Sequence, residues 1–338
     1  MPSLLITVFI ATWVLTALLR RYALAKSLLD VPNARSSHQL PTPRGGGVAF
    51  VLSFTLALGW LWWEGQLEAT ATVALLGGAG LIAVIGFMDD HGHIAARWRL
   101  LGHFVAAGWG LAWLGGLAPV ELMGQVIDFG VAGWVLGALY CVWLLNLYNF
   151  MDGIDGIASI EAISVCLGAA LLFGLHGDVS RIALPLLLGA SVAGFLLWNF
   201  PPAKIFMGDA GSGFLGMVLA LFSLRDAWAA PHNLWVWVIL LGVFVVDATF
   251  TLCRRLARRE KVYQAHRSHA YQHAARHHRG HLPVTLAVAA INVFWLLPMA
   301  YWVVHGLGGV LGMAIAYAPL VALAVWYHAG KPETLAQH

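Results

Sequence analysis

Charged residues and cysteines are scarce in this chain. Of its 338 residues only 10% are Asp, Glu, Lys or Arg, and only three are Cys. So little charge argues against a soluble globular domain of this length. The three cysteines lack metal-ligand spacing, which argues against a disulfide framework. The sequence also shows no internal repeat, low-complexity linker or separate soluble domain.

Apolar residues dominate the composition of the chain. The chain is 60% hydrophobic, its mean hydropathy is +0.77, and it contains 16 Trp. A membrane span needs about 20 mostly apolar residues, and eleven stretches qualify, at about 3–23, 46–63, 70–88, 98–117, 131–149, 157–175, 180–198, 211–228, 233–252, 283–305 and 306–327. We therefore expect an all-α, polytopic integral membrane protein of about 11 transmembrane helices, forming a single membrane-embedded domain over 1–338.

Lys and Arg predict the orientation, because positive residues are retained on the cytoplasmic side. If the N-terminus lies outside, 17 of the 19 Lys and Arg fall in inner loops or the C-terminal tail, and only Arg181 and Arg225 do not. No basic residue precedes the first apolar stretch and Arg20 and Arg21 follow it, so we expect a retained span and not a signal peptide. The net charge of +3 along the inner rim suits lipid headgroups and phosphate-bearing substrates better than a nucleic acid.

The first inner loop contains "DVPNARSSHQLPTPRGGG". Its Gly45–Gly47 turn, beside Arg35 and Arg44 and ahead of a predicted helix, is typical of an anion cradle. A basic loop that only obeys the positive-inside rule is an equal alternative.

Adjacent Asp89 and Asp90 end the third predicted span. Like charges raise each other's pKa unless a cation is near, so a divalent ion or a proton-transfer role would explain them. The alternative is a solvated loop pair that Arg97 and Arg99 partly neutralise.

The stretch "NLYNFMDGIDGIA" follows the fifth span and carries a polar residue at every third position. On a helix this spacing drifts by about 60° per step, so Asn149, Asp152 and Asp155 meet one ligand only if the helix breaks at the following glycines. A plain turn between spans would explain Asp and Gly but not Asn146.

Asp209 stands in "GDAGSG", directly before a predicted helix start. A carboxylate there is well placed to hold a metal while backbone N–H groups face phosphate.

The last inner loop, about 253–282, is rich in histidine. His266, His269, His273 and His277 have spacings of 3, 4 and 4, which predict one helical face. Zinc binding is one interpretation, but the basic neighbours favour a phosphate-binding surface, and a basic membrane-surface helix is the third. Asp247, within the ninth span, is either functional or paired with nearby arginines.

Taken in order, "MDD", "NLYNFMDGIDGIA", "PAKIFMGDAGS" and the histidine-rich loop resemble the polyprenyl-phosphate N-acetylhexosamine-1-phosphate transferases. The resemblance covers about residues 30–281. It implies transfer of a sugar 1-phosphate from a UDP-N-acetyl amino sugar to undecaprenyl phosphate, with release of UMP and with Mg²⁺ or Mn²⁺ as cofactor. The 17 to 2 bias of Lys and Arg predicts an outer, periplasmic N-terminus and a cytoplasmic C-terminus. With this orientation the resemblance implies a bacterial inner membrane location and a cytoplasmic site on loops about 25–45, 89–97, 150–156, 199–210 and 253–282. A homodimer is left open.

The resemblance also implies residue roles. Asp209, Asn149 and Asp152 resemble the metal-binding set, and Asp89 resembles the family's base or nucleophile with Asp90 as its neighbour. We expect Arg44, Asp155 and Asn199 to bind the nucleotide or phosphate. We expect His266 and His269 to act in catalysis near the diphosphate. Asn146 and Asp247 receive no role.

Three motifs narrow the branch: "DVPNARSSHQLPTPRGGG", "DDHGHIAARWRLL" and "HRSHAYQ" resemble enzymes that initiate O-antigen chains with 6-deoxy sugars such as N-acetylfucosamine or N-acetylquinovosamine. The N-acetylglucosamine branch is the alternative donor class. A secondary transporter is the alternative from another class, but transporters place their polar residues near the bilayer midplane, whereas these residues are predicted at one rim.

Overall fold

The computed structural model describes residues 1–32, 40–92, 94–260 and 266–331. Almost all of its regular structure is helical, which confirms the predicted fold class. The helices are α1 (Pro2–Ala25), α2 (Val48–Trp63), α3 (Ala69–His91), α4 (Ala96–Leu114), α5 (Gly130–Met151), α6 (Ile157–Leu175), α7 (Ala183–Asn199), α8 (Asp209–Ala227), α9 (His232–Leu240), α10 (Gly242–Ala257), α11 (Ala270–His277), α12 (His281–Ile291), α13 (Leu297–Val304) and α14 (Gly309–Trp326). A 3₁₀ turn, Val179–Arg181, precedes α7, and a π-helical turn, Asn292–Leu296, joins α12 to α13.

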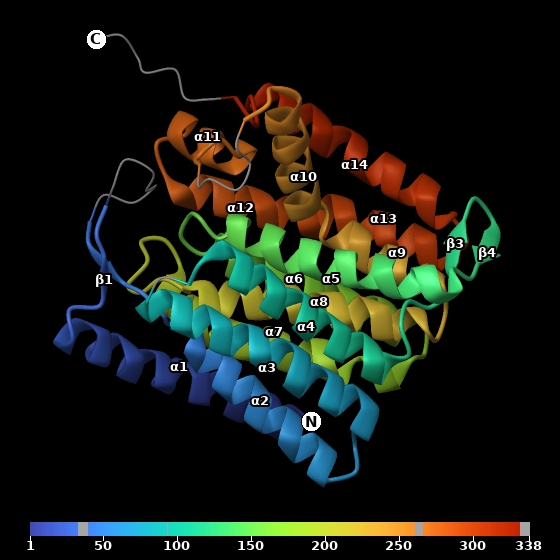
Figure 1. The fold of residues 1–338 in the computed structure, drawn as a ribbon, viewed down its shortest axis with the longest axis horizontal. Helices are drawn as coiled ribbons and strands as arrows, with labels where there is room; N and C mark the ends of the chain where they lie inside the picture. The colour runs from blue at the N-terminus through green and yellow to red at the C-terminus, as the bar shows by residue number, and fades with distance from the viewer. Residues whose placement is uncertain (33–39, 93, 261–265, 332–338) are drawn as a thin grey trace.

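Two small antiparallel pairs of strands mark opposite ends of the bundle. At one end β1 (Leu29–Asp30) pairs with β2 (Thr42–Pro43), and at the other β3 (Val120–Leu122) pairs with β4 (Gln125–Ile127). Figure 1 shows β1 and α11 near the first end and the β3–β4 hairpin at the second. The predicted inner loops therefore gather at one end of the helix bundle.

Several helices are long and apolar enough to cross a membrane. In the described part of the chain seven meet this test by length and composition, and an eighth does if the bent pair of α9 and α10 counts as one span. The chain is thus a multi-pass membrane protein. Helices occupy all eleven predicted ranges, but eleven crossings and the orientation of the termini stay predictions.

Helix α8 forms the centre of the bundle, and all its residues from Ala210 to Leu224 are buried. It packs mainly against α3 and α5. Two glycines permit this contact: a Cβ on Gly86 of α3 would lie 2.5 Å from the Asp209 carbonyl, and one on Gly216 would lie 2.5 Å from Leu145 Cα. Because both distances are far below a carbon contact distance, only glycine allows the helices to approach this closely.

The ninth predicted span is a bent pair of helices. The sequence predicts one span over 233–252, whereas the structure breaks at Leu241 and bends by 75° between α9 and α10. Helix α10 runs across the direction of α5 and α8 (Figure 1). Hydropathy cannot report this bend, because it measures apolar content and not direction. The bend follows tertiary packing at Gly242, where a Cβ would lie 2.9 Å from the Tyr317 ring.

The two arginines outside the predicted inner loops are neutralised locally. Arg181 Nε and Arg225 Nη1 each lie 3.4 Å from the buried Asp226 Oδ1, and Arg181 also pairs with Asp178. Asp226 further accepts a hydrogen bond from Trp237 Nε1. These charges form a compensated structural cluster near the C-terminal end of α8, the end opposite to Asp209.

Candidate active site

The ends of three helices bring the predicted acidic motifs together. Asp209 begins α8, Asp89 and Asp90 lie in the last turn of α3, and Asn149 and Asp152 lie at the end of α5. Because α8 packs directly against both α3 and α5, motifs separated by more than a hundred residues share one site.

The buried Asp90 caps helix α8. Its Oδ1 accepts the backbone N–H of Asp209 and its Oδ2 accepts that of Ala210, both at 3.2 Å. The first N–H groups of a helix have no partner within it, and a carboxylate also opposes the positive end of the helix dipole. Arg44 donates to the Asp90 carbonyl oxygen. These contacts favour a positioning role for Asp90, and its predicted catalytic role stays a prediction.

Asp89 makes a different set of contacts. It pairs with Arg99 of α4 and accepts the Ile94 N–H at 2.8 Å. The same Arg99 Nη1 lies 3.7 Å from Asp209 Oδ2. One guanidinium therefore bridges the two carboxylates to which the resemblance gives the base and metal roles. The sequence marked Arg99 only as a partial neutraliser.

Asn149 links α5 to the start of α8. Its Nδ2 lies 3.0 Å from Asp209 Oδ1 and 2.8 Å from Ser212 Oγ. The amide thus presents its donor group to Asp209 and holds that carboxylate in place. One helical turn earlier, Asn146 Nδ2 donates to the Val142 carbonyl at 2.7 Å and lies 3.4 Å from His103 Nδ1, so Asn146 makes structural contacts and does not join the acidic cluster.

Asp152 follows the last residue of α5 and is surrounded by other acids. Burial, together with the charges of Asp209, Asp90 and Asp155, raises the pKa of its carboxyl group to about 7. Near neutral pH the cluster therefore holds more negative charge than its surroundings compensate. This is the electrostatic condition in which a cation binds.

This pKa predicts how stability changes with pH. The folded pKa of Asp152 is above its value in the unfolded chain, so its contribution to the free energy of unfolding is greatest at low pH and is lost as pH rises toward about 7. Asp152→Asn removes this effect. In EDTA we expect wild type and variant to melt together near pH 4 and the variant to melt higher at pH 8, by about 2–4 °C for each kcal/mol regained. Thermal unfolding in detergent measures the difference, and a pH-independent difference would contradict it.

Asp155 and Asn199 connect the loop after α5 to the loop after α7. Asp155 Oδ2 accepts the Ala203 N–H at 3.0 Å, and its Oδ1 lies 3.2 Å from His281 Nδ1. The buried Asn199 accepts the Gly156 N–H at 3.0 Å and donates to the Ile205 carbonyl at 3.1 Å. Its side chain therefore holds two loops together, and direct nucleotide binding by Asn199 stays a prediction.

The prediction of an anion cradle is wrong for two of the three glycine amides, those of Gly46 and Gly47. The N–H groups of Gly46 and Gly47 donate to the carbonyls of Phe206 and Met207, at 2.9 and 2.8 Å. They dock this turn onto the loop before α8 and are not directed at an anion. Arg35, the other half of that prediction, lies outside the described residues.

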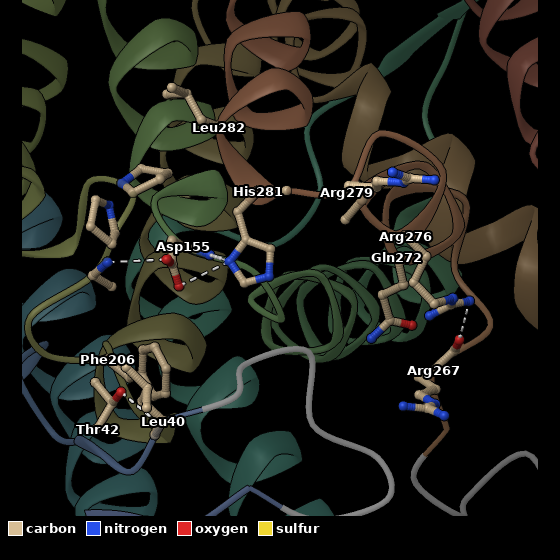
Figure 2. Close-up of a pocket in the computed structure, with 15 residues that line it drawn as sticks. Leu40, Thr42, Asp155, Phe206, Arg267, Gln272, Arg276, Arg279, His281 and Leu282 are labelled. Carbon is tan, nitrogen blue, oxygen red and sulfur yellow. Dashed lines mark hydrogen bonds and ion pairs between the residues drawn. The ribbon is translucent and has the colours of Figure 1, made fainter.

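A pocket of about 900 Å³ opens beside the acidic cluster. It is lined by the loop after α7, by α11 and by the start of α12. Figure 2 shows Asp155 and His281 on one side of this pocket and Arg267 and Arg276 on the other. Arg276 Nη2 also donates to the Arg267 carbonyl at 3.2 Å. Sequence analysis placed these two arginines in a basic loop but gave them no role.

The four histidines do not form the predicted single helical face. Helix α11 begins at Ala270, so His266 and His269 precede it and only His273 and His277 share it. His266 and His269 instead stack, with ring centroids 4.8 Å apart. Burial, followed by the nearby His269 and Arg255, lowers the pKa of His266 to about 4, so its ring is neutral at pH 7.

The predicted metal ligands match magnesium in chemistry. Mg²⁺ takes hard oxygen ligands, usually one or two carboxylates with water and substrate phosphate. Asp209 and Asp152 supply two such carboxylates at the start of α8 and the end of α5. In the ranges that the structure describes, no three His, Cys, Asp or Glu side chains are grouped for a metal ion. The full predicted set of Asp209, Asn149 and Asp152 stays a prediction.

Comparison with known proteins finds a family match over the central part of the chain. Residues 72–226 match the model of glycosyl transferase family 4. This range contains the acidic motifs of α3, α5 and α8 but not the histidine-rich loop.

Three relatives extend the match. A probable undecaprenyl-phosphate N-acetylglucosaminyl 1-phosphate transferase of Bacillus subtilis is 29% identical over 269 residues, covering 76% of this chain and 72% of its own. A decaprenyl-phosphate N-acetylglucosaminephosphotransferase of Mycolicibacterium smegmatis is 29% identical and covers 94% and 86%. A phospho-N-acetylmuramoyl-pentapeptide-transferase of Thermosynechococcus vestitus is 32% identical and covers 64% and 59%. All three are named as transferases, so the transporter alternative gains no support.

Proposed function

We propose that this chain is a membrane-embedded phosphosugar transferase of the glycosyl transferase family 4 type, and that it moves N-acetylhexosamine 1-phosphate from a UDP-sugar to undecaprenyl phosphate. The observation that carries this proposal is the convergence of Asp89, Asp152 and Asp209 beside an arginine-lined pocket. We also propose that this end of the bundle faces the cytoplasm of a bacterium, where UDP-sugars are made, and that the product initiates a cell-envelope polysaccharide such as O-antigen.

The pocket supports a place for the nucleotide sugar. Its volume of about 900 Å³ is within the usual range for small-molecule sites. Arg267 and Arg276 supply positive charge for a diphosphate, and Asp155 stands at the opposite side. We place the nucleotide between these two walls, with its diphosphate against Arg267 and Arg276.

The reaction joins two anions, so charge neutralisation is the main demand on the site. An oxygen of the lipid phosphate attacks the phosphorus that carries the sugar. The bond between this phosphorus and the bridging oxygen of the diphosphate breaks, and UMP leaves with that oxygen. In this one-step route Asp89 takes the proton of the lipid phosphate. In the two-step alternative the Asp89 carboxylate displaces UMP first, and the lipid phosphate then displaces Asp89 from the phosphorus. Arg99 holds Asp89 in place in both. Asp209 and Asp152 would hold Mg²⁺ or Mn²⁺, which would supply positive charge for the diphosphate.

The lipid tail needs an apolar surface close to this rim. A cavity of about 340 Å³ between α10, α11, α12 and α14 has a mostly apolar lining that includes Tyr271. Tyr271 Oη donates to the Phe150 carbonyl, two residues before Asp152. This cavity is therefore near enough to the acidic cluster to receive the first isoprene units of the acceptor.

Two donor classes each have an observation in their favour. The loop motifs resemble the branch that uses 6-deoxy amino sugars, whereas the B. subtilis and M. smegmatis relatives are named for N-acetylglucosamine. Sugar specificity depends on a few contacts worth about 1–3 kcal/mol each for apolar groups, which family membership does not determine.

A UMP-release assay tests both class and donor. Membranes containing the protein are incubated with undecaprenyl phosphate, Mg²⁺ and a panel of UDP-sugars that includes UDP-N-acetylglucosamine and the 6-deoxy analogues. We expect UMP release that depends on the lipid phosphate and prefers one donor. Folded protein that releases no UMP with any UDP-N-acetylhexosamine would contradict the transferase proposal. Membranes without the protein control for endogenous transferases.

A further inference from the structure

Asp247 is a buried carboxylate that holds the start of the histidine-rich helix. It lies on α10, the helix that begins after the bend, and its exposed fraction is 6%. Its Oδ1 accepts the Ala270 N–H and its Oδ2 accepts the Tyr271 N–H, both at 2.9 Å. Thr251 Oγ1 donates to Oδ1 at 3.1 Å. These hydrogen bonds offset the cost of burying the charge, and they fix the N-terminus of α11 against α10.

The same carboxylate orients His269. The His269 Nδ1 lies 3.2 Å from Asp247 Oδ1, and the ring is 3% exposed. An ionised carboxylate can only accept a hydrogen bond, so the neutral imidazole must carry its proton on Nδ1. The Nε2 atom then keeps its lone pair.

Helix α11 also contacts the end of α5, next to Asp152. Tyr271 Oη donates to the Phe150 carbonyl at 3.1 Å, and a Cβ on Gly153 would lie 2.1 Å from that hydroxyl. The Tyr271 and His269 rings are stacked, with centroids 5.6 Å apart. The geometry around Asp247 therefore reaches the end of α5, where Asp152 stands.

We propose that Asp247 is a positioning residue, which selects the Nδ1–H form of His269 and holds that ring against Tyr271, beside the end of α5 that carries Asp152. This inference rests on the proposed function, together with the role near the diphosphate that the resemblance implies for His269. Asp247 itself touches no substrate. It acts through His269 in the way that a buried carboxylate orients a catalytic imidazole.

A double-mutant cycle on Asp247 and His269 tests this role. Asp247→Asn keeps the size of the side chain but offers one acceptor oxygen and a competing NH₂ donor, so His269 loses its Nδ1 acceptor. We expect kcat for UMP release to fall by about 100-fold with little change in KM for the UDP-sugar. His269→Gln should give a similar loss, and the double variant should lose no more than the worse single variant.

Two variants serve as controls for the cycle. Thr251→Val removes another donor to the same carboxylate and should keep kcat near wild type. His269→Ala should lower activity far more than Glu121→Ala in the β3–β4 hairpin at the opposite end of the bundle. A wild-type kcat in Asp247→Asn would overturn the proposal. If Asp247→Asn lowered kcat by the same factor in the wild-type and His269→Gln backgrounds, the proposal would also be overturned, because a purely structural residue would act additively.

A spectroscopic measurement keeps this inference separate from the proposed function. The ¹⁵N shifts of the His269 imidazole, identified by their loss in His269→Gln, should report Nδ1–H in the wild type and Nε2–H in Asp247→Asn. An Nε2–H ring in the wild-type protein would overturn the positioning role whatever the activity. If the wild-type protein showed the expected tautomer but released no UMP, this result would count against the transferase proposal alone.

Discussion

Asp209→Asn should nearly abolish turnover while leaving the fold intact. The substitution removes one negative charge from the N-terminus of α8, where Asp209 faces Asn149 and Arg99. Loss of one electrostatic element of a preorganised site lowers kcat by about 100- to 1,000-fold, and loss of a metal carboxylate belongs at the upper end. Asparagine retains an oxygen to accept from Asn149, so expression and thermal stability should stay close to wild type. UMP release over a magnesium titration measures the effect.

Ser212→Ala is the matched control for this experiment. Ser212 Oγ accepts from the same Asn149 amide at 2.8 Å but carries no charge. Its loss should cost only a small part of kcat. If Asp209→Asn shows near-normal activity at every magnesium concentration, Asp209 is not a metal carboxylate. Equal losses in the two variants would assign the effect to the position of Asn149.

The adjacent Asp89 and Asp90 should respond in opposite ways to the same change. Asp89→Asn removes a group placed for proton transfer or attack, and we expect kcat to fall by about 100- to 10,000-fold with little change in Tm. Asp90→Asn leaves one of the two α8 amides facing an NH₂ group instead of an oxygen. A buried unsatisfied group costs about 1–3 kcal/mol, so this variant should lose thermal stability.

Paired measurements of kcat and Tm separate the two roles. The variants share charge, size and position in sequence, and each is therefore the control for the other. A large fall in Tm for Asp89→Asn, or an unchanged Tm with lost turnover for Asp90→Asn, would reverse the roles that the contacts favour.

Most of the helices and the gathering of the acidic motifs could be predicted from sequence. Apolar runs report helix ranges because a span has a minimum length, and the charge bias places the loops of Asp89, Asp152 and Asp209 at one end. Convergence followed from the resemblance and from this shared end. The contact of α3 and α5 with α8 confirms it.

The use of individual polar atoms could not be predicted in the same way. Asn199 and Asp90 lie in motifs that resemble a nucleotide site and a catalytic pair, yet their side chains bind backbone N–H groups of distant loops. Such partners depend on tertiary contacts between residues that sequence spacing does not relate. The amides of Gly46 and Gly47 were mispredicted for the same reason, because their acceptors are 160 residues away.

The bend after α9 shows that apolar composition predicts where a helix lies but not its direction. Apolar composition continues smoothly through Leu241, and no proline marks the break. Asp247 was the one local sign, since a carboxylate within a span needs a polar partner. Its partners, the amides of Ala270 and Tyr271, belong to a segment that begins beyond the end of α10.

The close packing of α8 has a mechanical consequence. With backbone against backbone at Gly86 and Gly216, the helix that carries Asp209 cannot slide or rotate without displacing α3 and α5 with it. Local opening is least favourable where many packed contacts must break together. The distance between Asp90 and Asp209 is therefore set by backbone contacts between helices and not by the loops that join them.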